Sequence, residues 1–247
     1  YYILKIKPDL KESLLNQVIY FSVTVILTFA MILPILIQPD LGFSVLIFLT
    51  FIFTSIGIKI NIFLNLIVFL LVILVGKMII KPYQMERLLT FLDPYKDPLG
   101  SGWQVINSVN SIINGGIFGL GFKNAELSKL GFLPEKDTDF IFSFIGEEFG
   151  LLGNLLIIFL FFLLLTSMFI TYLNTEDKYK RLVILYISSI IFLQSFQNMG
   201  MTVMATPVTG LPLPLVSYGG TNLLISIILL SFINNINLSI FKQEKLK

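Results

Sequence analysis

Long runs without a charged residue dominate the chain. No Asp, Glu, Lys or Arg lies between Glu12 and Asp40, and the next uncharged run extends from there to Lys59. The longest run, residues 182–241, is about twice as long as one membrane crossing requires. Three prolines within residues 207–214 divide this run, because proline interrupts a helix.

These runs predict six membrane-spanning helices. About 20 apolar residues, each adding about 1.5 Å of rise, cross about 30 Å of hydrocarbon. A polar segment of residues 82–139 separates the third helix from the fourth. The sequence therefore predicts an all-α polytopic membrane protein that forms one membrane domain over residues 1–247. We expect its spans at residues 15–38, 40–58, 60–81, 140–173, 181–205 and 214–241.

The distribution of basic residues predicts the orientation in the membrane. The two termini and the short connections near residues 59 and 178 carry ten Lys and Arg, whereas the connections near Pro39 and at residues 207–214 carry none. Short loops rich in Lys and Arg remain on the cytoplasmic side. Both termini are therefore expected in the cytoplasm, and residues 82–139 on the other side of the membrane.

Composition excludes several classes of soluble enzyme. Of the 247 residues, 55% are hydrophobic and 13% are charged, and the mean hydropathy is +0.88. The chain has no cysteine and no histidine, which excludes disulfides, thiol nucleophiles, histidine bases and the common zinc sites. Proton transfer must therefore use carboxylates, Lys, Tyr or water. A formal charge of +2 is too small to indicate a nucleic-acid partner.

Polar residues near helix breaks are the candidates for function, because burying them in a membrane is costly. Asp40 lies in the turn between the first two spans, where an Asp most simply caps the next helix. Glu147 and Glu148 lie more than one turn inside an apolar helix. Both a structural partner and a reactive role would explain these two glutamates.

The polar segment contains two further patterns. Trp103 to Ile113 carries apolar residues at helical spacing, which is typical of a helix on a membrane surface. The glycines from Gly115 to Gly121 lack the Gly-Lys-Ser/Thr sequence and the preceding strand of a phosphate-binding loop. Nucleotide binding is therefore excluded for this stretch.

Five ordered motifs resemble those of the SEDS family, the shape, elongation, division and sporulation proteins that polymerise peptidoglycan glycan strands. The similarity covers essentially the whole chain and is closer to the rod-shape (RodA) branch than to the division (FtsW) branch. Members have about ten spans, so the resemblance implies that this chain corresponds to the last six. The family usually has His before Thr-Asp-Phe, and Asp137 stands in that place. The motifs are Gln38–Gly42, Arg87–Asp97, Leu133–Phe142, Gly146–Glu148 and Pro212–Gly220.

The resemblance implies a glycosyltransferase that polymerises lipid II in cell-wall elongation and cell-shape control. Its active face would lie on the outer side of the bacterial cytoplasmic membrane. Its partners would be lipid II, the growing glycan strand, membrane lipid and a class B penicillin-binding protein, which is a transpeptidase. Two other functions remain open: a transporter that flips lipid II, and a scaffold that only positions a transpeptidase.

The resemblance also implies roles for individual residues. Asp139 corresponds to the family's proposed catalytic base, and Asp40 is a second carboxylate that would position substrate or a divalent cation such as Mg²⁺. Arg87 and Lys81 would bind pyrophosphate, although a basic residue at the membrane edge is also a common interfacial anchor. The other expected substrate-binding residues are Glu135, Thr138, Tyr218 and Gly219, and helix packing is a second explanation for the glycine.

Overall fold

The computed structural model describes residues 14–38, 40–100, 102–133 and 135–244. Within these residues the regular structure is entirely helical, which confirms the predicted fold class. Six long helices follow the six predicted spans. They are α1 (Leu14–Ile37), α2 (Leu41–Gly57), α3 (Ile62–Ile79), α7 (Ile141–Asn174), α8 (Lys178–Thr202) and α9 (Gly220–Glu244).

Helix length and composition support membrane crossing. Helices α7, α8 and α9 are each long and apolar enough to span a bilayer. The first three long helices contribute shorter apolar stretches at Phe21–Ile37, Leu41–Gly57 and Ile62–Gly76. Many Leu, Ile and Phe side chains on these helices are exposed in the protein alone. Such side chains face lipid in a polytopic helical protein.

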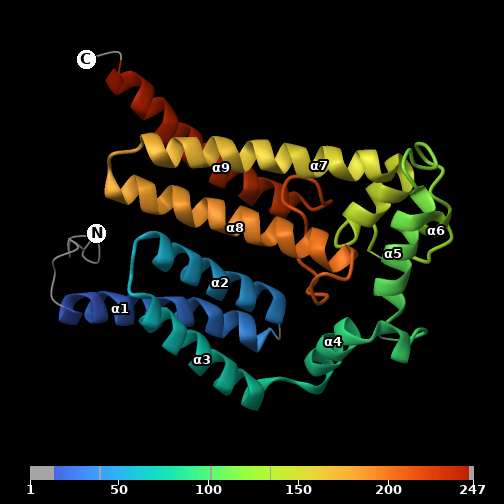
Figure 1. The fold of residues 1–247 in the computed structure, drawn as a ribbon, viewed down its shortest axis with the longest axis horizontal. Helices are drawn as coiled ribbons and strands as arrows, with labels where there is room; N and C mark the ends of the chain where they lie inside the picture. The colour runs from blue at the N-terminus through green and yellow to red at the C-terminus, as the bar shows by residue number, and fades with distance from the viewer. Residues whose placement is uncertain (1–13, 39, 101, 134, 245–247) are drawn as a thin grey trace.

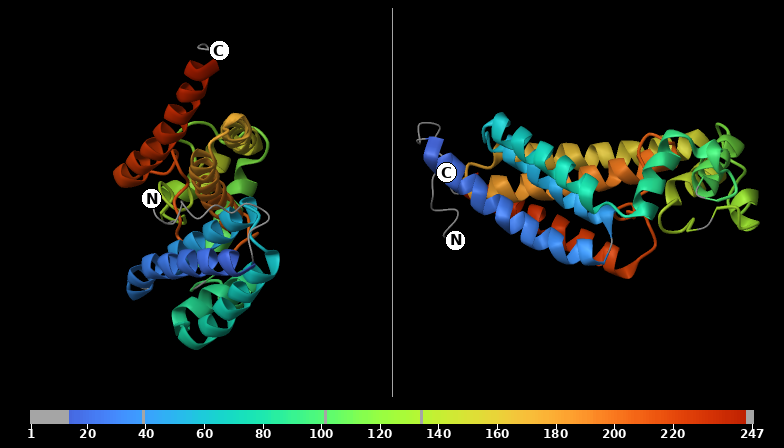
Figure 2. Two further views of the ribbon diagram at one scale, coloured as in Figure 1. Left: turned by 90° about the vertical axis from the view of Figure 1, so that its left-hand side faces the viewer. Right: turned by 90° about the horizontal axis from the view of Figure 1, so that it is seen from below.

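The long helices form a bundle with two different ends (Figure 1). One end carries the short α2–α3 and α7–α8 connections. The opposite end, which we call the distal end, carries the α1–α2 turn, residues 80–140 and the loop of residues 203–219. Figure 2 shows the segment before α7 gathered at this end in a second view.

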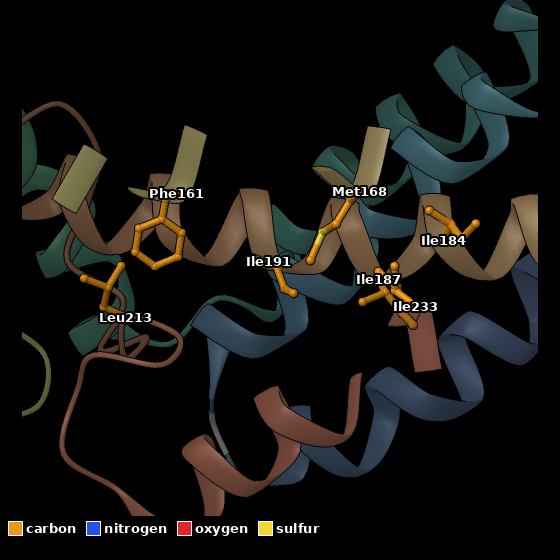
Figure 3. Packing of buried hydrophobic residues seen from close by; sticks show 7 residues of the cluster. All are labelled: Phe161, Met168, Ile184, Ile187, Ile191, Leu213 and Ile233. Atoms are coloured by element: carbon orange, nitrogen blue, oxygen red, sulfur yellow. The ribbon is translucent and has the colours of Figure 1, made fainter. Parts of the chain in front are cut away.

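Apolar side chains hold the bundle together in two main clusters. The larger cluster joins α7, α8 and α9 with the 203–219 loop, and Figure 3 shows its members. A second cluster joins α1 and α2, with partly buried residues of α3 against it. A smaller group of Leu46, Leu193 and Leu211 links α2, α8 and the loop. The loop is therefore packed between both parts of the bundle. The members of the larger cluster are Phe161, Met168, Ile184, Ile187, Ile191, Leu213 and Ile233.

The polar segment before α7 folds into short helices at the distal end. These are α4 (Pro82–Leu92), the 3-10 helix η2 (Pro94–Lys96), α5 (Trp103–Gly115) and α6 (Glu126–Lys129). The residues of α5 predicted at a membrane surface are helical, but their buried face packs against α7 and α8. Only the exposed face of α5, which includes Ile113, is therefore available for contact with lipid.

The structure differs from two of the predicted spans, at the start of one and inside the other. Helix α9 begins at Gly220 and not at residue 214, because residues 207–219 form an irregular loop around the prolines. The predicted span at 140–173 is not one uninterrupted helix, because Gly150 has φ 70° and ψ −166°. A Cβ at Gly150 would lie 2.4 Å from both the Gly119 nitrogen and the Ile117 oxygen. The close approach of this neighbouring backbone explains why α7 breaks at a glycine.

Candidate active site at the distal end

The irregular loop of residues 203–219 is held by side-chain amides of α8. Gln194 donates to the Pro212 carbonyl at 2.8 Å, and Gln197 donates to the Pro207 carbonyl at 2.7 Å. Asn198 donates to the Leu211 carbonyl at 2.7 Å. These residues lie three and four positions apart and so share one helix face. They supply donors to loop carbonyls that no helix or sheet satisfies.

Asp139 lies in the turn that precedes α7, and this turn is bound to the same loop. The carbonyls of residues 137–139 each accept one hydrogen bond. The Tyr218 backbone N–H donates to the Asp137 carbonyl at 2.8 Å. The Ser217 hydroxyl donates to the Thr138 carbonyl at 2.6 Å, and the Asn198 amide donates to the Asp139 carbonyl at 2.8 Å. Asn198 therefore holds the Asp139 backbone and the loop with its two amide hydrogens. One hydrogen bond therefore holds the Asp139 carbonyl, and two more hold the two residues before it.

The surroundings of the Asp139 carboxyl make it a better proton acceptor. Burial raises the pKa of Asp139, and the negative charge of Glu135 raises it further. Arg87 on α4 acts in the opposite direction and lowers this pKa. The charges of Glu135 and Arg87 therefore act directly on Asp139. The structure brings these three predicted site residues into one electrostatic environment.

Glycine at position 210 leaves room for the carboxyl. Gly210 has φ +71°, and a Cβ there would lie 3.2 Å from Oδ2 of Asp139. A larger residue would therefore strain the backbone and crowd the carboxyl oxygen. This close approach places the Asp139 side chain against the middle of the loop.

Asp40 lies two residues before the point where α2 approaches the loop. Its Oδ1 accepts a hydrogen bond from the Phe43 N–H at 3.0 Å, so Asp40 is the N-cap of α2. A Cβ at Gly42 would lie 2.6 Å from the Thr209 carbonyl oxygen and 3.4 Å from Oδ1 of Asp40. Thr209 and Gly210 are consecutive, so the start of α2 and the Asp139 carboxyl both lie near one short stretch of the loop.

The other predicted polar residues lie around this centre. Arg87 and Lys81 are exposed on α4 and at its N-terminal cap, where the Lys81 N–H donates to Gln84 at 2.9 Å. Glu135 is exposed and accepts a hydrogen bond from the Thr138 hydroxyl at 3.0 Å. Both cations therefore remain open to a ligand, and Thr138 orients Glu135.

Tyr218 and Gly219 lie at the edge of a small pocket. Tyr218 is 80% exposed and lines a pocket of about 310 Å³ together with Asp137, Ile141 and Val216. A Cβ at Gly219 would meet only Asn222 Cβ at 3.6 Å, which is an ordinary contact. Helix packing therefore does not explain this glycine. Asp137, which stands where the family usually has His, faces the pocket.

The two buried glutamates of α7 have structural partners. The carboxylate of Glu147 accepts hydrogen bonds from the Leu127 N–H at 2.8 Å and from the Ser128 N–H and hydroxyl at 3.2 and 2.6 Å. The carboxylate of Glu148 accepts one from the Lys123 N–H at 2.8 Å. Glu147 thus binds the N-terminus of α6, which favours a negative charge. Of the two explanations left open by the sequence, the structural one holds.

The family model described as the cell cycle protein family FtsW/RodA/SpoVE matches residues 2–241. The chain belongs to this family. This confirms the resemblance carried by the five motifs, because the family comprises the shape, division and sporulation proteins. The relatives described next carry FtsW, RodA and sporulation names, so closeness to the RodA branch stays a prediction.

Three curated relatives illustrate the similarity. A probable peptidoglycan glycosyltransferase FtsW of Wigglesworthia glossinidia brevipalpis is 36% identical over 90% of this chain and 58% of its own length. The peptidoglycan glycosyltransferase RodA of Treponema pallidum is 38% identical over 66% of this chain and 38% of its own. Stage V sporulation protein E of Bacillus subtilis is 36% identical over 85% of this chain and 58% of its own. The matched part of the chain thus spans between 38% and 58% of the length of these relatives.

A solved structure shares the fold. It belongs to work on the structural coordination of polymerization and crosslinking by a peptidoglycan synthase complex. The match has a TM-score of 0.75 at 30% identity and covers 97% of this chain and 68% of that chain. The helical arrangement described above is therefore shared with a protein of such a complex.

Sequence reasoning missed the residues that position the site in this FtsW/RodA/SpoVE family member. The hydrophobic pattern places Gln194, Gln197 and Asn198 only within an apolar span. The sequence does contain an indication of this role, because three amides on one face of a membrane helix require polar partners. Ser217 belongs to one of the five motifs, but its bond to the Thr138 carbonyl joins segments far apart in sequence.

The described residues contain no preformed cluster of carboxylates for a metal ion. Across the part of the chain that the structure describes, no three Asp or Glu residues lie close enough together to hold an ion. Magnesium prefers an octahedral set of oxygen ligands, and Asp40 contributes one oxygen to a helix cap. Magnesium is also held by one or two carboxylates together with substrate phosphates, so a divalent cation at Asp40 stays a prediction.

Proposed function

We propose that this chain forms peptidoglycan glycan strands from lipid II. The carrying observation is that three hydrogen bonds hold the backbone of residues 137–139, while the Asp139 carboxyl has a raised pKa and lies within the field of Arg87. A base and a cation at one end of a membrane bundle suit a substrate that joins a sugar to a lipid pyrophosphate. The glycosyltransferase names of the relatives support the same reaction.

The proposed reaction assigns each residue one task. A hydroxyl of the acceptor sugar attacks the anomeric carbon of the donor, and its proton passes to Asp139. The bond from that carbon to the pyrophosphate oxygen breaks, and undecaprenyl pyrophosphate leaves with inversion at the carbon. Arg87 and Lys81 bind the negative charge of this leaving group. No step is routed through a metal.

The remaining residues position the sugars in this proposal. Asp40 and Glu135 accept hydrogen bonds from sugar hydroxyls on either side of the loop. Thr138 orients Glu135 through its hydroxyl. Tyr218 supplies an exposed ring against which a sugar can stack, and Gly219 lets the substrate approach the backbone.

We further propose that the distal end faces the outside of the bacterial cytoplasmic membrane and that the protein acts with a class B penicillin-binding protein in wall elongation. The distribution of basic residues supports the orientation. The similar solved structure comes from a complex described by both polymerization and crosslinking, which supports a crosslinking partner. A role in cell shape rests on the predicted closeness to the RodA branch.

Polymerisation of purified lipid II by Asp139→Asn tests this proposal. Asparagine has nearly the same shape but cannot act as the base, so we expect polymer formation to fall at least about 100-fold. Glu126→Gln is the matched control, because Glu126 is an exposed carboxylate on α6, outside the site. Full polymer formation by Asp139→Asn would overturn the assignment.

The same preparation distinguishes the two other functions. A lipid II flippase would move labelled lipid II across liposomes without making polymer, and broken helices around polar residues fit such a protein. A scaffold would bind the transpeptidase while doing neither. Polymer from the purified wild-type protein alone would contradict both alternatives.

A further inference from the structure

Exposed apolar side chains gather where α5 ends and the chain approaches α7. Ile113 and Ile117 are 69% and 59% exposed, and Phe118 and Phe122 are 80% and 69% exposed. Phe149, at the break in α7, lies with its ring 6.4 Å from that of Phe122. Isolated exposed apolar residues are common, but a contiguous group marks an interaction surface. We call residues 113–122 the apolar turn.

The depth of the apolar turn follows from the length of α7. At the other end of this helix, Arg181 lies 4.9 Å from the Tyr172 ring and donates to its carbonyl. Aromatic and basic residues of this kind mark a membrane boundary. About 30 Å of hydrocarbon corresponds to about 20 helical residues. Counting back from Tyr172 by that length reaches Leu152, just beyond the break in α7.

Backbone hydrogen bonds place the apolar turn at that same depth. The Leu151 N–H donates to the Gly116 carbonyl at 2.9 Å, and the Leu152 N–H donates to the Ile117 carbonyl at 3.3 Å. The turn is therefore level with the first residues of the membrane-spanning part of α7. Leu151 and Leu152 are themselves 49% and 52% exposed, so the lipid-facing surface of α7 continues directly onto the turn.

The backbone of the turn is prepared for an apolar environment. Irregular chain can enter hydrocarbon only when its N–H and carbonyl groups are satisfied internally. The Gly116 and Gly119 N–H groups donate to the carbonyls of Ile113 and Gly115 at 3.1 and 2.8 Å. The N–H groups of residues 120 and 121 donate to the carbonyls of Glu147 and Glu148 at 3.0 and 2.9 Å. These bonds lower the cost of placing the turn among acyl chains.

A basic residue borders the turn on its polar side. The Lys123 ammonium lies 5.5 Å from the centre of the Phe122 ring. A lysine beside an inserted aromatic ring can extend toward lipid headgroups while its stem covers apolar surface. The order of side chains from Phe118 to Lys123 thus matches the order from acyl chains to headgroups.

We propose that the apolar turn inserts into the lipid leaflet at the distal end and anchors α5 and the first part of α7 to the membrane. The occupant of this surface is the acyl-chain edge of the bilayer. This inference does not rest on the proposed function, because it uses only the depth, exposure and hydrogen bonding of the turn. A protein partner covering the same surface is the competing occupant.

Tryptophan fluorescence provides a direct test, because the chain contains a single tryptophan. Trp103→Phe removes it while keeping a ring against Phe132. Phe118→Trp in this background then reports on the turn alone. Leu130→Trp is the matched control, because Leu130 is 72% exposed. It follows α6, which lies at the tip of the distal end, far from the α2–α3 and α7–α8 connections (Figure 1).

Each variant of the full chain is reconstituted into phosphatidylcholine vesicles with bromine on the acyl chains close to the headgroup. We expect the Trp at position 118 to lose a severalfold larger fraction of its emission than the Trp at position 130, and to emit at shorter wavelength. Phe122→Trp provides a second reporter and should be quenched in the same way. Quenching at positions 118 and 122 that is as weak as that of a fully water-exposed Trp would overturn the proposal.

Discussion

Asp40 and Asp139 lie near one stretch of loop, through Gly42 and Gly210, but have different surroundings. Asp40 caps α2, so its carboxylate already accepts a hydrogen bond from the Phe43 N–H. Asp139 is held through its backbone, and burial and Glu135 raise the pKa of its carboxyl. A general base needs a side chain that accepts a proton readily and a backbone that does not move. At the residue scale, Asp139 meets both conditions.

Asn198 is the residue on which the position of the Asp139 backbone most depends. Asn198→Ala would leave the Asp139 and Leu211 carbonyls without their amide donor. We expect a loss of about 1–3 kcal/mol in the free energy of unfolding, because buried carbonyls without partners are costly. Gln194→Ala removes one such bond, to Pro212, and should cost less. Thermal unfolding in detergent measures both, and an equal effect of the two variants would contradict this role for Asn198.

The break in α7 is the feature at the element scale that shapes the distal end. Gly150→Ala would force a side chain into the backbone of residues 117 and 119 at a positive φ. We expect the free energy of unfolding to fall by more than about 3 kcal/mol, because backbone strain and overpacking combine at this position. The control is Gly76→Ala in α3, where a Cβ meets nothing within 4 Å.

The control should move in the opposite direction. Alanine favours a helix over glycine by about 0.5–1 kcal/mol, so Gly76→Ala should be slightly stabilising. Denaturation monitored by helical circular dichroism separates the two variants. A Gly150→Ala protein as stable as Gly76→Ala would show that the α7 break is not required.

The sequence predicted the apolar elements well because hydrophobic runs depend on local composition. Six helices follow the six predicted spans, and the prolines correctly marked the loop of residues 203–219. The break at Gly150 was not predicted, because it depends on contact with the distant residues 117 and 119. The partners of Glu147 were missed for the same reason, since they lie on α6.

At the site, motifs indicated the residues but not their neighbours. Asp139, Glu135 and Arg87 were predicted, and the structure places their charges within reach of one another. The amides of α8 were not predicted to act there, because an Asn within an apolar run does not reveal which carbonyls it binds. Side-chain bonds between distant segments are set by the tertiary fold.

The orientation of the whole molecule can be tested with cysteine labelling, because the chain has no cysteine. Lys59→Cys lies in the α2–α3 connection and Glu126→Cys lies on α6, at opposite ends of the bundle. If the distal end faces outward, a membrane-impermeant maleimide should label position 126 on intact spheroplasts and position 59 only after permeabilisation. The reverse pattern would contradict the orientation derived from the basic residues.

If Asp139 is the base for glycan polymerisation, the pH dependence of kcat/KM for lipid II must follow the ionisation of its carboxyl. Activity requires the ionised carboxylate, so it should fall in acid with a midpoint above 3.8, the ordinary value for Asp. Glu135→Gln removes a charge that raises the pKa and should move the midpoint down. Arg87→Gln should move it up. A midpoint that neither substitution shifts would contradict the account.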